Sequence, residues 1–186
     1  MKHISLGLGL ALTLIAFLFG LFIGRMNTPE YRLSMYEKNM TLGRADTLLD
    51  LRYLNAMIIH HRGAMLLAAQ AERSNRTEIR ELAKAIQAGE PKLIAELYQW
   101  KKEWYSDTRT VRDPIVARLG DVDVTFDLRF LNALIAHHEA GILMTRETRL
   151  KSSRSAILDN ADAVEAFLTG SGKQLREWRK AWYGLE

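Results

Sequence analysis

The first apolar stretch of the chain is continuous rather than periodic. Residues 4–24 carry no charged side chain, and Lys2 and Arg25 flank them. As a helix rising 1.5 Å per residue, this stretch would be ~30 Å long, which matches the hydrocarbon core of a bilayer. A signal peptide would have a shorter apolar core and a small-x-small cleavage site, which does not follow here. The pattern therefore predicts a transmembrane helix, an uncleaved anchor over residues 1–26, with a cleaved signal peptide as the alternative.

Beyond residue 45, apolar positions recur every three or four residues, the spacing of amphipathic helices. The apolar pattern falls into two pairs of helices. Asp46 and Asp123 are good N-caps for the first helix of each pair. Pro91 should kink a later helix. No stretch alternates as a strand would. The pattern predicts an all-α chain, with a connecting helix or linker over residues 27–45 and helices over about 46–73, 77–105, 123–150 and 151–183.

The helical part of the sequence is a duplication. Residues 50–61 read DLRYLNAMIIHH and residues 127–138 read DLRFLNALIAHH, so nine of twelve positions are identical at an offset of 77. A Trp-x-x-x-Trp-Tyr motif closes each unit. Two units of this kind predict two helical hairpins, residues 46–105 and 123–183, in a four-helix bundle over residues 46–186. We expect the first helices of the units to face each other. We also expect one aromatic cluster at one end of the bundle, made of Trp100, Trp104, Trp178 and Trp182.

The amino-acid composition excludes several kinds of metal site and catalytic residue. The chain has no cysteine, which excludes disulfides, thiolate metal sites and a cysteine nucleophile. Its net charge of +4 over 186 residues is mild, and no nucleic-acid partner is expected.

The candidate functional residues are histidines and methionines on the repeated helices. His60 and His61 border an apolar stripe with Met57 between them, and His137 and His138 repeat this placement. Imidazole is a common metal ligand, and thioether sulfur prefers soft ions such as Cu(I). The alternative is that these residues only fill the core, as Met on an apolar stripe usually does. The candidate metal ligands are His60, His61, His137, His138, Met57, Met65 and Met144.

Other chemistry finds little support in the sequence. Neither histidine pair has the Glu-x-x-His spacing of di-iron bundles or the His-Glu-x-x-His of zinc proteases. The chain also lacks a Gly-rich phosphate loop and a nucleophile with a plausible base. We therefore expect no enzyme activity. Non-covalent haem remains open, because helical bundles can offer axial histidines.

The repeated motif resembles a known family. Asp50, Tyr53, Leu54, Met57, Ile58, His60 and His61 fit the pattern of domain-of-unknown-function family 305, and Asp127 to His138 fit it again with Leu134 in place of Met. The resemblance implies a ferritin-like four-helix fold in an exported or membrane-anchored protein. Some members, of the CopM type, bind copper through Met and His. This chain departs from the family pattern at Leu67, Glu90 and Leu97 as well as at Leu134.

Together these observations predict a single-pass membrane protein, anchored through residues 4–24, with its soluble domain on the periplasmic or extracytoplasmic side. The domain would bind copper or a similar metal and store, buffer or hand it over. The alternative is a structural or interaction subunit without metal, in a homodimer or a membrane complex. Ile59 and Leu66, with Ala136 and Leu143 in the second unit, favour this alternative because they lie on the side expected to face water. A non-covalent haem protein is the third interpretation.

Overall fold

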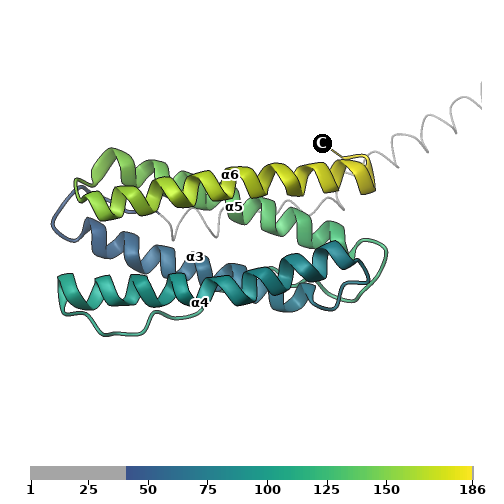
Figure 1. The fold of residues 1–186 in the computed structure, drawn as a ribbon, viewed down its shortest axis with the longest axis horizontal. Coiled ribbons are helices and arrows are strands. Elements are labelled where there is room, and N and C mark those ends of the chain that lie inside the picture. The colour runs from purple at the N-terminus through teal and green to yellow at the C-terminus, as the bar shows by residue number, and fades with distance from the viewer. Residues whose placement is uncertain (1–40, 186) are drawn as a thin grey trace, which may run out of the picture. The chain divides into compact units, whose positions relative to one another are not determined.

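The computed structural model describes residues 41–185, which fold into four α-helices and contain no strand (Figure 1). The helices are α3 (Leu49–Ala71), α4 (Thr77–Tyr105), α5 (Phe126–Lys151) and α6 (Ser155–Tyr183). The predicted all-helical, four-helix domain is confirmed. The predicted anchor over residues 1–26, and the connecting segment up to residue 40, lie outside the described residues. Within residues 41–185, no helix is both long enough and apolar enough to cross a membrane.

The first helix of each unit begins later than its sequence suggests. Asp46 and Asp123 were expected to cap α3 and α5, but each helix starts three residues further on. The Asp46 carboxylate instead accepts a hydrogen bond from the Leu48 N–H at 3.0 Å, and that of Asp123 from the Thr125 N–H at 2.8 Å. Asp side chains form such turns with a backbone N–H two residues on. The two acids therefore organise the turn that leads into the helix.

The second helices are unbroken. Pro91 lies inside α4 without ending it, and α6 continues through Gly170 and Gly172. Each of these helices packs along a first helix, α4 on α3 and α6 on α5. This tertiary packing outweighs the local preference of Pro and Gly against the helix interior.

The two hairpins meet through α3 and α5, which run antiparallel. Ser152, just after α5, donates a hydrogen bond of 2.7 Å to Asp50 at the start of α3. Ser74, just after α3, donates one of 2.6 Å to Asp127 at the start of α5. These matching contacts relate the hairpins by an approximate twofold axis between α3 and α5. The expectation that the first helices of the two units face each other is confirmed.

The tryptophans form two stacked pairs, Trp100 with Trp104 and Trp178 with Trp182, with ring centroids 5.1 and 5.3 Å apart. The Arg154 guanidinium, at the start of α6, lies over Trp104. That of Arg76, before α4, lies over Trp182. The expectation of a single cluster is wrong. Because the hairpins are antiparallel, the last turns of α4 and α6 lie at opposite ends of the bundle (Figure 1).

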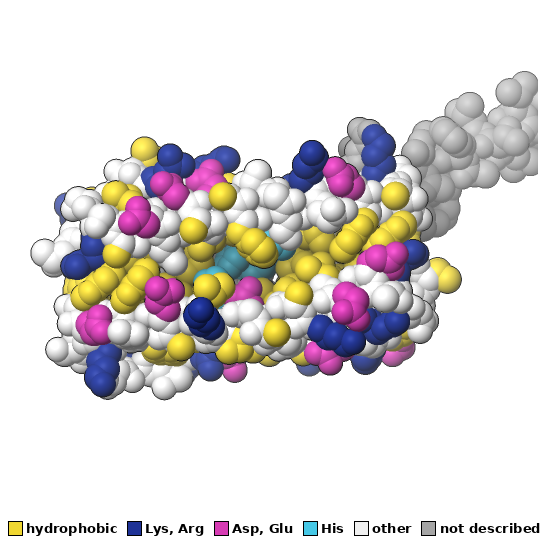
Figure 2. Space-filling view, in the orientation of Figure 1, with side chains coloured by type: hydrophobic (Ala, Val, Ile, Leu, Met, Phe, Trp, Pro, Cys, Tyr) yellow, Lys and Arg dark blue, Asp and Glu magenta, His cyan; other side chains and the backbone are white. Residues whose placement is uncertain are grey.

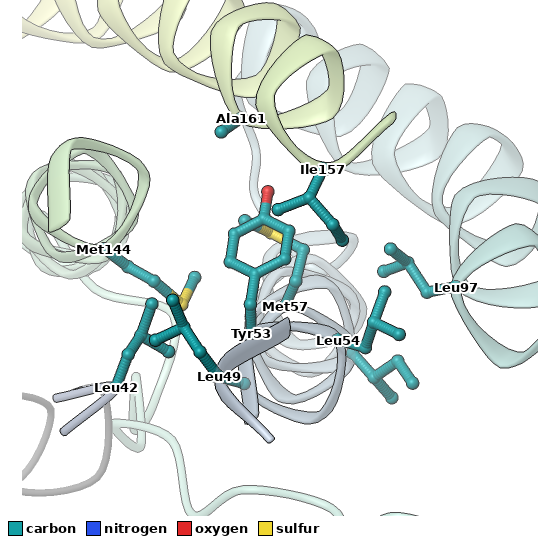
Figure 3. Packing of buried hydrophobic residues seen from close by; sticks show 11 residues of the cluster. Leu42, Leu49, Tyr53, Leu54, Met57, Leu97, Met144, Ile157 and Ala161 are labelled. Carbon is teal, nitrogen blue, oxygen red and sulfur yellow. The ribbon is translucent and has the colours of Figure 1, made fainter. Parts of the chain in front are cut away.

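A cluster of buried hydrophobic residues lies around the first turns of α3. Figure 3 shows Tyr53 and Met57 of α3 between Met144 of α5 and Ile157 of α6. The Tyr53 hydroxyl donates a hydrogen bond of 2.6 Å to the side chain of Asn160. Burial of this ring with its hydroxyl bonded ties α3 to α6 across the bundle.

The repeat extends beyond the helices into the segments that precede α3 and α5. Gly43 and Gly120 both have positive φ, 71° and 69°, which a side chain would strain. The guanidinium Nε of Arg52 donates to the Leu42 carbonyl at 2.6 Å, and that of Arg129 to the Leu119 carbonyl at the same distance. The duplicated unit therefore starts before residues 46 and 123, which are the limits that the helix pattern predicted.

Candidate metal-binding site

Four histidines form a row across the centre of the bundle. The rings of His60 and His137 stack, with centroids 3.9 Å apart and planes at 27°. His61 lies 6.1 Å from His60, and His138 lies 6.2 Å from His137, both edge-on. The order across the bundle is therefore His61, His60, His137, His138. All four side chains are buried.

One glycine makes this close approach feasible. A Cβ at Gly141 of α5 would lie 2.3 Å from Nε2 of His60 and 2.5 Å from a methyl carbon of Leu168. Real Cβ atoms do not approach other atoms so closely. The equivalent residue of α3, 77 positions earlier, is Ala64. Gly141 therefore provides the space that the His60 ring occupies.

The hydrogen bonds of three rings define which nitrogen carries the proton. Nε2 of His60 donates to the His137 carbonyl at 3.2 Å, and Nδ1 of His138 donates to the Leu134 carbonyl at 2.7 Å. Nδ1 of His61 is hydrogen-bonded to the Glu90 carboxylate. Carbonyl and carboxylate oxygens only accept, so the bonded nitrogen is the donor. The other nitrogen of each ring then keeps its lone pair. For His60 this is Nδ1, which is buried without a hydrogen-bond partner among the described residues.

Burial holds most of the row in its neutral form. Desolvation, with added repulsion from the neighbouring histidines, lowers the pKa of His60 well below its usual value. The same two causes lower the pKa of His137 to about 3, and desolvation also lowers the pKa of His138. At neutral pH these three imidazoles are uncharged, which is the form that binds metal ions.

The row lies at the floor of a groove of about 560 Å³ between α4 and α6. Figure 2 shows the histidines at the bottom of this hollow, with hydrophobic side chains on both sides. The α4 wall carries Leu82, Ile86 and Leu93, and the α6 wall carries Val164, Phe167 and Leu168. Glu90 is the one charged side chain among the described lining residues.

The three candidate methionines do not line this groove. Met57 and Met144 are fully buried in the core around Tyr53. Met57 is one helical turn from His60 and His61, whereas Met144 is seven residues, ~10 Å along the helix, from His137. Met65 is half-buried, and its carbonyl accepts a hydrogen bond from Gln87. The structure thus brings the four histidines together and leaves the three sulfur-containing side chains outside the groove.

The described arrangement does not converge on one point. Within residues 41–185, no three or more His, Asp or Glu side chains form a group that could hold a metal ion. An imidazole lone pair lies in the plane of its ring, so the stacked rings of His60 and His137 do not direct their lone pairs at a point between them. Coordination by several of these histidines therefore requires their rings to rotate.

Sequence reasoning missed the contact between Glu90 and His61. The two residues are 29 positions apart on different helices, so helical periodicity within α3 gives no sign of it. The available signal was the departure from the family pattern at Glu90.

Comparison with known proteins agrees with this description. Residues 50–118 match a family described as "Domain of unknown function (DUF305)". No curated protein matches the chain. Among solved structures, "CopM in the Cu(I)-bound form" has a TM-score of 0.64 at 23% identity and covers 72% of this chain and 97% of its own. "CopM in the apo form" has a TM-score of 0.64 at 24% identity, covering 72% and 98%.

At these identities the structural match establishes the fold alone. The match to residues 50–118 is a match of sequence, and it contains the first copy of the repeated motif. The resemblance to the DUF305 family that the motif indicated is therefore confirmed, and the four-helix domain has the fold of the CopM structures.

Proposed function

We propose that this protein binds copper, and stores, buffers or hands it over, through His60, His61, His137 and His138. The observation that carries the proposal is the row of four buried histidines at the floor of a groove. Burying four polar rings in a bundle core is unfavourable unless they are well satisfied. Nδ1 of His60 is buried without a partner among the described residues, so the row is not optimised for stability alone.

The donor set suits the proposed cargo. Neutral imidazole nitrogen binds copper and related ions, and two rings, His61 and His138, keep a free lone pair on Nε2. Structures of the same fold are described as CopM in Cu(I)-bound, Cu(II)-bound and Ag-bound forms, which supports copper as the cargo. Met57, Met65 and Met144 would be additional soft ligands, and Met57 is the one next to the histidine pair in sequence.

The role would be binding rather than catalysis. A groove between two helices lets an ion enter and leave. The uncharged stretch of residues 4–24 supports the rest of the proposal, a single-pass anchor with the soluble domain on the periplasmic side.

The test is a Cu(I) competition titration of the full chain in detergent. His61→Ala and His138→Ala should each weaken binding far more than Met65→Leu, which mainly changes packing. A variant with all four histidines replaced by alanine should lose binding. Unchanged copper affinity in that variant would contradict the proposal.

A second candidate function, a structural or interaction subunit, is favoured by the outer face of α5. Leu143 and Leu150 are seven residues apart on this face, and 54% and 86% of their surface is exposed. Exposed apolar side chains on one face suit a protein partner. Replacing both with serine would then prevent co-purification with that partner and leave copper affinity unchanged.

The third candidate function is non-covalent haem binding, which the apolar walls of the groove favour. A Soret band on haem titration would support it.

A further inference from the structure

The two halves of the groove are related by the repeat but differ in chemistry. Along the second helices, the repeat has an offset of 78: buried Ile79, Ala83 and Leu97 of α4 correspond to buried Ile157, Ala161 and Leu175 of α6. The same offset pairs every lining residue of α4 with one of α6. By this rule Glu90 corresponds to Leu168. One half of the groove therefore has a carboxylate where the other half has a buried leucine.

This difference reaches the histidines. In the first half, Nδ1 of His61 is hydrogen-bonded to the Glu90 carboxylate. In the second half, Nδ1 of His138 donates to the Leu134 carbonyl of its own helix. Both bonds leave Nε2 as the nitrogen that carries the lone pair. Only the first half bonds a carboxylate directly to its imidazole, and the Glu90 charge reaches His138 without a hydrogen bond, where it opposes the lowering of the His138 pKa.

The Glu90 carboxylate lies in a mostly buried and apolar environment, where its negative charge has a strong effect. Its side chain is 13% exposed, and its partner among the described residues is the hydrogen-bonded His61 ring rather than a Lys or Arg. A carboxylate on an apolar wall is costly unless a cation or a strong hydrogen-bond donor compensates it. A monovalent cation bound at Nε2 of His61 would make the local charge neutral.

We propose that Glu90 is a positioning residue that makes the His61 end of the row the first to bind a monovalent soft cation. This inference rests on the proposed function. The carboxylate fixes the ring orientation and the Nδ1–H tautomer, and its charge offsets that of the ion. Carboxylates that accept a hydrogen bond from a ligating histidine act in this way and typically change metal affinity ~10- to 100-fold. The His138 end has only a neutral carbonyl in this place and fills second.

The test uses Ag(I), a monovalent soft ion, with the full chain in detergent. Glu90→Gln keeps an acceptor for the His61 proton and removes the charge, whereas Glu90→Leu removes both. Glu96→Gln, an exposed acid on the same helix, is the matched control for the change in net charge. We expect Glu90→Gln to weaken the first Ag(I) binding step about 10-fold, Glu90→Leu about 100-fold, and Glu96→Gln less than twofold.

Nitrogen-15 NMR of the imidazoles tests positioning directly. Without silver, His61 should show the Nδ1–H tautomer in the wild type and in Glu90→Gln, and lose it in Glu90→Leu. The first equivalent of Ag(I) should shift Nε2 of His61 before Nε2 of His138.

The opposite filling order, simultaneous filling, or a Glu90→Gln affinity within twofold of Glu96→Gln would overturn the inference and leave copper binding standing. A wild-type chain that binds neither Ag(I) nor Cu(I) would overturn both. Because Gln matches Glu in shape, the Glu90→Gln arm keeps the test decisive even where Glu90→Leu folds poorly.

Discussion

The ends of the bundle and its middle differ in how well their polar groups are hydrogen-bonded. At each end, an Asp at the start of one first helix accepts a hydrogen bond from a Ser just after the other, and an Arg lies over a Trp. In the middle, four imidazoles are buried beside a groove, and one of their nitrogens lacks a partner among the described residues. Contacts at the ends hold the hairpins together, whereas the middle buries polar rings at a cost to stability.

The largest expected effect is the loss of stability of the metal-free protein in mild acid. Burial lowers the pKa of His60, His137 and His138 in the folded state, whereas unfolded histidine titrates near 6.5. Above pH ~6.5 both states are neutral and the stability is full. As pH falls below this value, only the unfolded state takes up protons, so stability drops by up to ~1.4 kcal/mol per pH unit for each histidine.

Urea unfolding between pH 7 and pH 5 would measure this loss, because most carboxylates titrate lower. The double variant His60→Leu/His137→Leu is the control, and its stability should depend less on pH. A wild-type free energy of unfolding that stays constant over this range would show that the buried histidines do not lower stability as we propose.

The next effect is steric. Gly141→Ala should destabilise the protein by about 1–3 kcal/mol, because its Cβ would overlap the His60 ring and Leu168. Gly170→Ala is the matched control, since it is also a glycine inside a helix and has no atom within 4 Å of the added carbon. The control should gain about 0.5–1 kcal/mol from helix propensity. Denaturant unfolding of the two variants would decide, and equal effects would contradict the close packing at His60.

At the ends, Trp104→Ala and Trp182→Ala should each lower the free energy of unfolding by about 1–2 kcal/mol. This is less than the ~3–5 kcal/mol for a fully buried ring, because both indoles are half-buried. The two losses should be similar, since each ring stacks on a second Trp and lies under an Arg. Losses that differ by more than about 1 kcal/mol would show that the ends are not equivalent.

The smallest effect concerns one hydrogen bond. Ser74→Ala removes the donor to Asp127 and should destabilise by about 1 kcal/mol, with Ser152→Ala giving the same result at the other end. Neither change should alter metal affinity, because both sites lie far along α3 and α5 from the histidines. Changed Cu(I) binding in either variant would contradict the separation between the ends and the middle.

Much of this arrangement could be predicted from the sequence because it follows from the repeat. The histidine pairs stand at the same register on two like helices, so a twofold axis between these helices brings them together. Repetition does not give the direction in which the helices run, and for this reason one tryptophan cluster was expected where two pairs exist. The Glu90–His61 contact also depends on how α4 is rotated against α3, which periodicity alone does not determine.

The shared segments ahead of α3 and α5 suggest how such an asymmetric groove could arise. The repeat includes the Gly43 and Gly120 turns and their arginine contacts, so the duplicated unit is a whole hairpin with its lead-in. Two separate copies of that hairpin would meet as a symmetric homodimer, in which every substitution appears twice. Fusion into one chain removes this constraint. One unit can then carry Glu90 where the other carries Leu168, and Ala64 where the other carries Gly141, as no homodimer of identical hairpins would allow.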